Sequence, residues 1–551
     1  MNISKYTKNI KGDFTGGLTA AIIALPMGLA FGLQSGLGAE AGLYTAIILA
    51  IIASIVAGTK TLISDPTGPM TIVAAAIIAN AGINTDGGMA TIIITFALAG
   101  IFQIVFGLIK VAQYVKYISY PVLSGFMGGI GIIIILFQWH SFFGEKTPGK
   151  ILDIIGHLPD PIIHHHWSAI ILGGITLATI YLMPLISKKL PNGLIALVIG
   201  TLASLALKKY SFEGDWLFST IGEIPSKLPE LKLNFLSEFD MANISIVVVS
   251  ALTLAGLGTI DTLLTSVVAD NITKTKHKGN RELIGQGLGN FIAALFGGIP
   301  GAGSTTGTVA NINSNGKSNL SGIFKGIFLL IVLLGLGKYL SIVPIPVLSA
   351  LLISVGIGII DFKGIKRLLK IKNSDTLVLM LVILLTVFAD LLVAVGVGMV
   401  LSSFFFMQRM GEIVNKQSKK GKLSDVHKKL KIPKSIEDRV YDYELDGPLF
   451  YGFSDQFKAQ AEEIEGKDAV IINMSSVPYI DASGIYVLEE VITSFQSKNT
   501  EVVLVGVKDH IFSQFEKLKL IPNVLPEEKA YNSVRAGLKY LKYKLEESSE
   551  K

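Results

Sequence analysis

Long runs of apolar residues, separated by short polar stretches, make up most of the chain as far as about residue 410. A helix needs about 20 such residues to cross the hydrocarbon core of a bilayer. Half of the 551 residues are hydrophobic, 16% are charged, and the mean hydropathy is +0.57. Soluble globular chains do not reach these values. We therefore predict an α-helical, polytopic membrane protein whose main surroundings are the lipid bilayer.

Composition excludes several classes of function. The chain has no cysteine, so disulfides, thiolate metal sites and a cysteine nucleophile are ruled out. The net charge of +6 is spread over loops, and no nucleic acid partner is expected. No constellation typical of an enzyme is found, so the protein is predicted not to be one. The first apolar run is too long for a signal peptide and is interpreted as a retained span.

The apolar segments form two sets of seven, with a polar stretch between the sets. The segments lie at roughly 14–33, 41–57, 70–82, 89–112, 119–142, 168–187 and 193–207, and then near 245–270, 284–298, 305–313, 319–340, 344–361, 374–390 and 391–408. The third and the tenth are too short to span a membrane, and they occupy corresponding places in the two sets. This pattern suggests fourteen membrane segments built as an internal repeat.

Basic residues follow the even-numbered segments, as the positive-inside rule requires of cytoplasmic loops. One such loop contains Lys363, Lys366, Arg367, Lys370 and Lys372. We therefore predict that both termini are cytoplasmic, in a multi-pass protein of a bacterial-type inner (plasma) membrane.

The composition changes after Phe406. We predict a transmembrane domain over 1–410, a basic linker over 411–436, and a soluble domain over 437–551. Strand patterns such as "AVIINMSSV" alternate there with amphipathic patterns such as "SGIYVLEEVITSFQSK", which indicates a cytoplasmic α/β module. The closing "KYKLEESSEK" is predicted to be a disordered tail.

The two short segments share one design. "SDPTGPMTIVAAAI" (Ser64 to Ile77) and "PGAGSTTGTVANI" (Pro300 to Ile312) each place Pro, Gly and hydroxyl residues before a brief apolar run. Irregular backbone at membrane depth survives only where protein buries it or where it lines a cavity. Short helices that begin there would point unpaired amides and positive dipole ends at the cavity. The pair is predicted to bind an anion.

Carboxylates in these segments are the next candidates. Asp261 lies inside the eighth segment, whereas Asp270 lies at its end. Asp261 and Thr265 are four residues apart and share a helix face, which suits a small cation or a proton. A structural hydrogen bond to a neighbouring helix is the alternative. Asp65, directly before Pro66, either caps the short helix or tunes the field of the anion.

Three longer stretches resemble a known family. "GDFTGGLTAAIIALPMGLAFGLQSGLGAEAGLY", "NRELIGQGLGNFIAALFGGIPGAGSTTGT" and "VPYIDASG" are similar to sulfate-permease-type (SulP) anion transporters that end in a STAS domain. The resemblance covers essentially the whole chain. Within that family, "TLISDPTGPMT" and "SVVADNITKTKHKGNRELIGQG" resemble BicA-type sodium-dependent bicarbonate transporters.

The resemblance implies a fold and a site. The fold is fourteen segments as a 7+7 inverted repeat, divided into a core domain and a gate domain, in a homodimer. The anion would lie between the short helices, near Thr67 and the backbone of Ser304 and Thr305. The residues that the resemblance assigns to Na⁺ are Asp261, Thr265, Gly303 and Thr305. Met27 and Phe31, after Pro26, would line the substrate pocket together with Gly303, although plain packing explains them equally well.

One position departs from the family pattern. Many members have an arginine shortly after the Ser-Thr stretch of the tenth segment, where this chain has Gly307. We find no other buried cation in the sequence. Helix dipoles and bound Na⁺ are then expected to supply the positive charge, which favours cation coupling and puts bicarbonate itself in question.

Two polar motifs remain. In "DASG", Asp481 and Ser483 mark a helix start, and in regulatory relatives the matching serine accepts phosphate, although a helix cap explains the motif more simply. A cytoplasmic regulator of the STAS domain is a possible partner. "HHHW" (His164 to Trp167) is expected to be an interfacial loop rather than a metal site, because three adjacent histidines cannot face one ion.

Three hypotheses follow. The first is a Na⁺-coupled symporter of a small inorganic anion, bicarbonate, that works by elevator-type alternating access. The second is a proton-coupled sulfate or dicarboxylate permease in which Asp261 carries the proton. The third is an anion-responsive signalling protein whose output is the STAS domain.

Overall fold

The computed structural model describes residues 9–547 except for a set of short gaps. These gaps are 83–86, 149–150, 188–190, 211–218, 223, 225–227, 233–238, 240, 242–243, 372, 390, 418, 423–436, 463 and 465. The chain divides into two compact units, Met1–Val400 and Leu401–Lys551.

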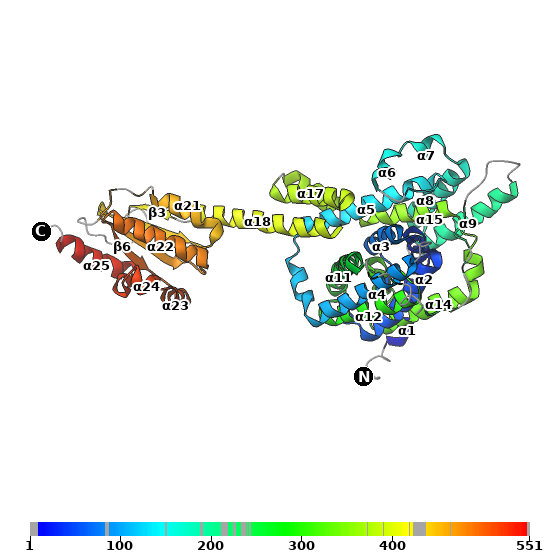
Figure 1. Ribbon diagram of the computed structural model, residues 1–551, viewed down its shortest axis with the longest axis horizontal. Coiled ribbons are helices and arrows are strands. Elements are labelled where there is room, and N and C mark those ends of the chain that lie inside the picture. Colours follow the sequence, from blue (N-terminus) through cyan, green and yellow to red (C-terminus); the bar gives the residue numbers. More distant parts are fainter. Residues whose placement is uncertain are drawn as a thin grey trace. The chain divides into compact units, whose positions relative to one another are not determined.

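The first unit is almost entirely helical (Figure 1). Its amino-terminal half contains α1 (Ile10–Ser35), α2 (Ala39–Val56), α3 (Gly68–Ala81), α4 (Gly88–Leu108), η3 (Val111–Tyr117), α5 (Tyr120–Phe142), α6 (Ile151–Gly156), α7 (Asp160–Ile163), α8 (Trp167–Ile186) and α9 (Asn192–Tyr210). Its second half contains α11 (Ile244–Thr273), α12 (Gly279–Leu295), α13 (Thr305–Asn313), α14 (Leu320–Leu340), α15 (Ile345–Ile359), α16 (Phe362–Ile371), α17 (Ser374–Phe388) and the start of α18 (Leu391–Gln417).

Each of the predicted apolar segments coincides with one of these helices. In the described part of the chain, nine helices are long and apolar enough to cross a membrane. The helices α3 and α13 contain 14 and 9 residues, so the two segments predicted to be too short are short. A polytopic helical membrane fold is confirmed, whereas fourteen crossings and the inverted repeat stay predictions.

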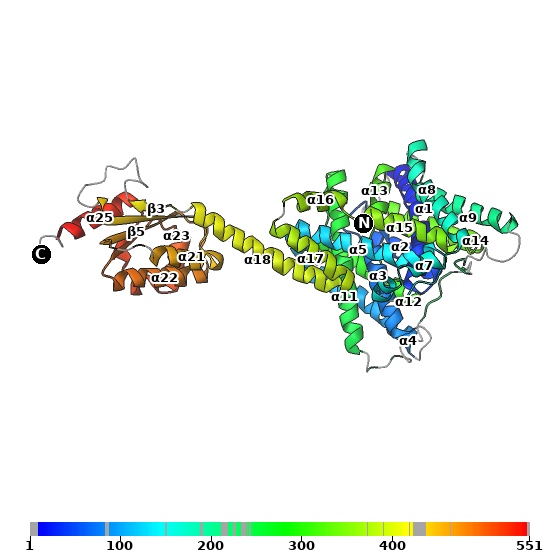
Figure 2. The ribbon, with the colours of Figure 1, turned by 90° about the horizontal axis from the view of Figure 1, so that it is seen from above.

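The helices of this unit pack in two groups. A first helix group joins α1, α2, α3 and α4 to α11, α12, α13 and α14, with close packing of α12 on α2 and α4 and of α14 on α1 and α2. A second helix group joins α5, α8 and α9 to α15 and α17. In Figure 1, α5, α8, α15 and α17 lie above α4, α11 and α12, and Figure 2 shows the same helices from above.

Two very short strands interrupt the first helix group. Strand β1 (Ser64–Asp65) precedes α3, and β2 (Ala302–Gly303) precedes α13. They pair antiparallel, with Ser64 opposite Gly303. The amide of Ser304 donates to the carbonyl of Ile63 at 2.7 Å, which extends the pairing. Exchange of hydrogen bonds between the two broken segments satisfies backbone that is not helical at this depth.

The polar face of α12 holds both strands. Gln286 and Asn290 are four residues apart and therefore share one face. Gln286 donates to the hydroxyl of Ser64 at 2.5 Å. Asn290 accepts from the amide of Gly301 at 2.8 Å and donates to its carbonyl at 2.9 Å. Side chains of a single helix thus position the entry to each short helix.

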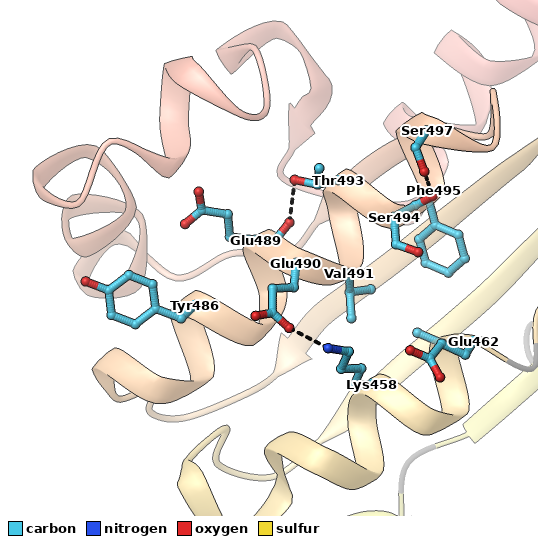
Figure 3. A pocket seen from close by; sticks show the side chains of 11 residues that line it. Lys458, Glu462, Tyr486, Glu489, Glu490, Val491, Thr493, Ser494, Phe495 and Ser497 are labelled. Atoms are coloured by element: carbon cyan, nitrogen blue, oxygen red, sulfur yellow. Dashed lines mark hydrogen bonds and ion pairs between the residues drawn. The ribbon is translucent and has the colours of Figure 1, made fainter.

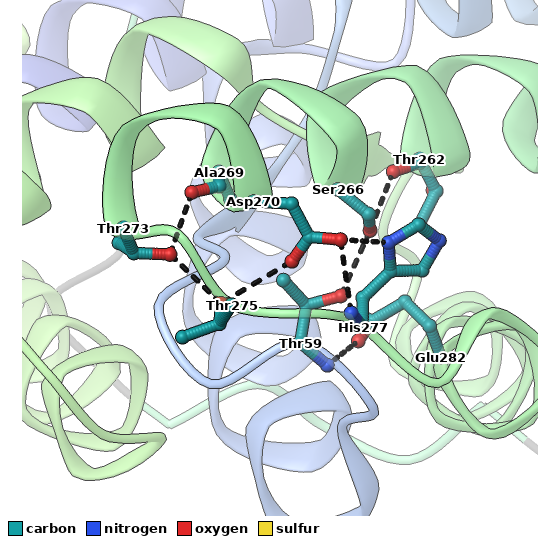
Figure 4. Close-up of polar contacts among 9 residues, drawn as sticks. All are labelled: Thr59, Thr262, Ser266, Ala269, Asp270, Thr273, Thr275, His277 and Glu282. Carbon is teal, nitrogen blue, oxygen red and sulfur yellow. Dashed lines mark hydrogen bonds and ion pairs between the residues drawn. The ribbon is translucent and has the colours of Figure 1, made fainter.

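The turn before β1 is fixed in the same way (Figure 4). Glu282 on α12 accepts from the amides of Gly58 and Thr59 at 2.8 and 2.7 Å. The Thr59 hydroxyl lies 2.8 Å from the hydroxyl of Ser266 on α11. Two helices of the second half therefore clamp the turn between α2 and β1.

The second unit contains a five-stranded sheet in the order β3-β4-β5-β6-β7, in which only the pair β3-β4 is antiparallel. The strands are β3 (Lys419–Lys422), β4 (Val440–Asp446), β5 (Ala469–Ser476), β6 (Glu501–Val505) and β7 (Ala530–Tyr531). The helices are α21 (Tyr451–Glu462), α22 (Ala482–Ser497), α23 (Asp509–Lys517), α24 (Leu520–Asn523) and α25 (Val534–Glu547), with η5 (Glu527–Lys529) between the last two.

Alternate strand residues face two cores. Val470 and Ile472 of β5 pack with α21, α22 and α23, whereas Ala469 and Ile471 pack with α25. This follows from the two-residue period of a strand. The predicted α/β module is confirmed.

One predicted boundary differs from the structure. The tail prediction is wrong over 542–547, because α25 continues to Glu547 and buries Leu541 and Leu545. Position 410 falls inside α18, and residues 419–422 of the predicted linker form β3. Residues 423–436 of that linker lie outside the described residues.

Candidate functional site

A cavity of about 480 Å³ lies in the first unit where the short helices begin. The starts of α3, α9 and α13, the middle of α11, and parts of α1, α5, α8 and α15 line it. The lining includes all six predicted substrate residues, namely Met27, Phe31, Thr67, Gly303, Ser304 and Thr305. Asp261 lines the same cavity. Residues distant in the sequence are thus brought together as predicted, although their roles stay predictions.

Both short helices begin at the cavity wall. Thr67 is the N-cap residue of α3 and has extended backbone, and within the described residues its side chain makes no capping bond. Ser304 is the N-cap of α13, and its hydroxyl accepts from the amide of Gly307 at 3.2 Å. The first amides of any helix lack partners within the helix, and the dipole is positive at that end. Two such ends at one cavity can bind an anion.

A group of oxygen atoms lies beside the helix starts. The hydroxyl of Thr265 donates to the carbonyl of Gly303 at 2.8 Å and lies 2.8 Å from the hydroxyl of Thr305. Thr262, which the sequence analysis did not single out, accepts from the amide of Gly303 at 3.1 Å. Three of the four residues predicted to hold Na⁺ are therefore in direct contact.

Asp261 completes that set. It is 8% exposed, and among the described residues its Oδ2 atom has no hydrogen-bond partner. The hydroxyl of Thr67, which faces this carboxylate, likewise makes no hydrogen bond of good geometry in the described part of the chain. A buried polar atom without a partner is costly, so both atoms are suited to a ligand that enters the cavity. Carboxylate, hydroxyl and carbonyl oxygens are the ligands of hard cations.

Asp65 does not cap α3. Its carboxylate forms an ion pair with the ammonium group of Lys325 on α14. The sequence left a cap and an effect on the field of the anion open for Asp65, and the contact with Lys325 favours the second. The side chain points into the first helix group, where a second buried charge compensates its own.

The expectation that no buried cation would be found is also wrong, because Lys325 is fully buried. The sequence signal was present as a single lysine inside the apolar run "LSGIFKGIFLLIVLL". An ionisable residue at that position is a functional candidate by default. Its partner lies 260 positions earlier, so the pair itself could not be read from local sequence.

Gly307 lies against this ion pair. A Cβ atom at position 307 would be 3.0 Å from Cγ2 of Ile63, 3.2 Å from Oδ2 of Asp65 and 3.3 Å from Oγ of Ser304. The absence of a side chain lets β1 and α13 approach closely. The position noted as a departure from the family pattern therefore touches the carboxylate that Lys325 compensates.

Met27 and Phe31 lie one helical turn apart on α1, after Pro26. Both line the cavity, and Phe31 is fully buried. They form part of its apolar wall. Their positions are compatible with plain packing and with substrate contact, so both alternatives stay open.

The remaining sequence candidates lie elsewhere. Asp481 is the N-cap of α22 and accepts from the amide of Gly484 at 2.7 Å, as expected of a helix cap. Ser483 lies in the first turn and is half-buried. The ring of His165 packs edge-on against Trp167 at 4.6 Å, and Trp167 is 65% exposed. Within the described residues, no group of three or more His, Asp or Glu could hold a metal ion.

The second unit has a groove of its own, of about 640 Å³, between α21 and α22 (Figure 3). Lys458 forms an ion pair with Glu490 across it at 2.9 Å, and both side chains are about half exposed. Glu462 and Glu489 also line it, whereas Asp481 and Ser483 are not among the lining residues. This groove and the DASG motif are therefore separate features.

The polytopic helical fold, with two helix starts facing one internal cavity, defines a membrane transport protein. Residues 10–382 match the model of the Sulfate permease family, and residues 431–537 match that of the STAS domain. The chain belongs to the sulfate permease family and is an anion transporter of that family.

Named relatives cover nearly the whole chain. The chain is 40% identical over 536 residues to the bicarbonate transporter BicA of Picosynechococcus sp., covering 95% of this chain and 93% of the relative. It is 38% identical over 492 residues to the bicarbonate transporter BicA of Synechocystis sp., covering 88% and 85%. These relatives are transporters, which agrees with the prediction that the protein is not an enzyme.

Two solved structures are similar. The transmembrane domain of a cyanobacterial BicA superposes with a TM-score of 0.65 at 42% identity, over 70% of this chain and 98% of that chain. Murine Solute Carrier 26 family member A9 superposes with a TM-score of 0.81 at 19% identity, over 98% of this chain and 92% of that one. The second likeness concerns the fold alone.

Proposed function

We propose that the protein is a Na⁺-coupled bicarbonate symporter. The observation that carries the proposal is the pair of buried, unpartnered oxygens, Asp261 Oδ2 and Thr67 Oγ1, which in the described part of the chain lie at the cavity where two helices begin. One oxygen is anionic and suits a cation, and the helix starts suit an anion. The BicA relatives are named bicarbonate transporters.

Bicarbonate would lie between the starts of α3 and α13. The amides that follow Thr67 and Ser304 would donate to its oxygens, and the hydroxyl of Thr67 would supply a further donor. Met27 and Phe31 would close the apolar side of the pocket. A small planar anion fits a site made of a few donors on an apolar wall.

Na⁺ would be held by Asp261, Thr265, Gly303 and Thr305. The contacts of 2.8 Å that Thr265 makes with Gly303 and Thr305 support this, because the same oxygens can turn toward a cation. Without Na⁺ the charge of Asp261 repels an anion in the same cavity, and with Na⁺ that repulsion is cancelled. Each ligand then raises the affinity for the other by the same factor, which is the basis of coupling.

Transport would proceed by elevator-type alternating access. All the residues proposed to bind ions lie on or directly before helices of the first helix group, and none lies on α5, α8, α9 or α17. The first helix group can therefore carry both ions as one body against the second helix group. The first group would be the core domain and the second the gate domain.

The remaining features of the proposal concern assembly. The transmembrane domain would end near 410 and the STAS domain would begin near 437, with both termini in the cytoplasm of a cell with a bacterial-type inner membrane. The protein would be a homodimer. Ser483 and Asp481 would mark the surface to which a cytoplasmic regulator binds.

Uptake into proteoliposomes tests the proposal. Radiolabelled bicarbonate, sulfate and fumarate are offered with an inward Na⁺ gradient, with an inward proton gradient, and with neither. We expect bicarbonate uptake that requires Na⁺ and is lost in Asp261→Asn. Asp270→Asn is the matched control, because Asp270 lies on the same helix and is not among the residues that line the cavity.

Two results would replace the proposal. A proton gradient that drives sulfate or fumarate uptake, lost in Asp261→Asn, would make Asp261 the proton carrier, which its unpartnered oxygen also allows. No accumulation of any anion would favour a signalling role for the STAS domain. Bicarbonate uptake that ignores Na⁺ and survives Asp261→Asn contradicts the proposal directly.

A further inference from the structure

The ammonium group of Lys325 has a full set of acceptors. It donates to the carbonyl of Ser64 at 2.6 Å, to the carbonyl of Ala46 at 3.3 Å and to the carboxylate of Asp65. A lysine ammonium has three protons, so each proton is used. Two of the three acceptors belong to β1, the strand that leads into the binding helix α3.

Asp65 connects this cation to the anion site. Its carboxylate lies beside Ser304, the N-cap of α13, since a Cβ atom at position 307 would be 3.2 Å from Oδ2 of Asp65 and 3.3 Å from Oγ of Ser304. Ser304 lines the cavity, whereas Asp65 and Lys325 do not. A charge on either member of the pair therefore acts on the site from just behind its wall.

The sum of charges at the site follows from these contacts. Asp261 is the charged residue among those that line the cavity in the described chain. Behind the wall, Asp65 and Lys325 cancel one another. Glu282 is buried on α12, but the amides of Gly58 and Thr59 hold its carboxylate at the turn before β1. With Na⁺ beside Asp261, the charges of the lining residues, of the Asp65–Lys325 pair and of the cation sum to zero.

We propose that the Asp65–Lys325 pair selects the valence of the transported anion, favouring singly charged anions over doubly charged ones. This rests on the proposed function in one respect, that Na⁺ neutralises Asp261. A neutral site with two partial positive helix ends matches one negative charge. A dianion loses about four times as much hydration energy, because the Born energy grows with the square of the charge, and it meets no net cation in return.

Position 307 lies close enough to Asp65 for a side chain there to change the balance of charge. A side chain there would approach Oδ2 of Asp65, since even a Cβ atom would be 3.2 Å away. A positively charged side chain at position 307 would place a second cation, in addition to Lys325, beside the carboxylate of Asp65. In this chain Gly307 carries no charge. The charges of Lys325 and Asp65 cancel, so no net positive charge remains to balance the second charge of a dianion.

Three variants change the sum of charges in steps. Asp65→Asn removes the negative member of the pair, Lys325→Met removes the positive member, and the double variant removes both. The sum of charges becomes more positive, more negative and again neutral at any pH where the remaining buried group stays ionised. Binding of bicarbonate, nitrate and sulfate to the full-length protein in detergent, at saturating Na⁺, is measured by titration calorimetry. The readout is the affinity for sulfate divided by the affinity for nitrate.

We expect the wild type to bind nitrate or bicarbonate more tightly than sulfate. Asp65→Asn should raise the ratio on the order of tenfold, because the added charge acts on two anion charges rather than one. Lys325→Met should lower the ratio by a similar factor, and the double variant should return it to the wild-type value. Asp270→Asn, which removes one negative charge elsewhere on α11, should leave the ratio unchanged.

Equal affinity ratios in all variants overturn the proposal, because loss of a purely structural pair would weaken the binding of both anions by the same factor. If Asp65→Asn does not fold, the other two variants decide the question. The sulfate-to-nitrate affinity ratio should fall in Lys325→Met and return to the wild-type value in the double variant. A wild type that binds nitrate but not bicarbonate contradicts the bicarbonate function and leaves the selection of valence intact. A wild type that binds sulfate most tightly overturns the selection of valence.

Discussion

Lys325 on α14 and Asp65 on β1 form an ion pair in the interior of the first helix group. The side chains are 0% and 5% exposed. Neither charge can be solvated by water there, so each depends on the other. The pair ties a long helix to the strand that begins the cavity wall, and it therefore concerns stability as well as the choice of anion.

Breaking the pair should destabilise the protein strongly. Lys325→Met and Asp65→Asn should each lower the free energy of unfolding by roughly 3–5 kcal/mol, since each leaves one buried charge unpaired. The double variant should cost less than the sum of the two, by more than about 1 kcal/mol. Thermal melting of the full-length protein in detergent provides the measurement. Lys338→Met, at an exposed position on the same helix, is the control and should melt like the wild type.

Thr265→Val should weaken Na⁺ activation of uptake without removing transport. The valine keeps the shape of the side chain but loses the oxygen that contacts Gly303 and Thr305. One lost polar contact to an ion is worth about 1.5–3 kcal/mol, so the Na⁺ concentration for half-maximal uptake should rise at least about tenfold.

The control for this variant is on the same helix. The hydroxyl of Thr253 bonds back to the carbonyl of Val249, one turn earlier. Thr253→Val should therefore leave the Na⁺ dependence unchanged. A Thr265→Val protein with normal Na⁺ dependence would show that Thr265 braces β2 and does not touch the ion.

The parts of the site that sequence reasoning found share a local signature. Pro and Gly before a short apolar run identified the starts of α3 and α13, and the spacing of four identified Asp261 and Thr265. These signals depend on neighbours in the chain. The domain with alternating strands and helices was found for the same reason.

The features that the sequence did not predict depend mostly on contacts between segments that are distant in the chain. Lys325 is a lone lysine in an apolar helix, and only its contact with Asp65 distinguishes it from one that extends to the membrane surface. The pairing of Ser64 with Gly303 involves strands of two residues, too short for any periodic pattern. The end of α25 was missed because the charged closing residues outweighed Leu541 and Leu545, which are buried four positions apart.

Gly301→Ala should impair both transport and stability. A Cβ atom at this position would lie 2.5 Å from the carbonyl oxygen of Asp65 and 2.6 Å from Cδ2 of Leu49. Because the nearest atom is backbone, the two strands must separate, and overpacking of this kind costs about 1–3 kcal/mol. We expect uptake to fall at least about fivefold and the melting temperature to drop.

Gly335→Ala is the matched control for that change. Among the described residues, no atom outside the nearby backbone of α14 lies within 4 Å of a Cβ atom at position 335. Uptake and melting should both stay at wild-type values. A Gly301→Ala protein with normal uptake would mean that the close approach of the strands is not needed for the site.

The DASG motif separates a structural role from a regulatory one. Asp481 accepts from the amide of Gly484 at 2.7 Å, so Asp481→Ala should remove the cap of α22 at a cost of about 1 kcal/mol. Hydrogen exchange of the first amides of α22 in the full-length protein should then speed up about fivefold. Asp481→Asn keeps an acceptor oxygen and should exchange like the wild type.

Ser483 provides the second half of this test. If the motif is only a cap, Ser483→Ala and Ser483→Asp should leave uptake unchanged, because the hydroxyl is not the group that caps α22. If a phosphate at Ser483 regulates transport, Ser483→Asp should change the maximal rate of uptake while the Na⁺ dependence stays the same, since the charge acts in a different compact unit from the cavity. Uptake by both variants with normal exchange of α22 distinguishes the two roles.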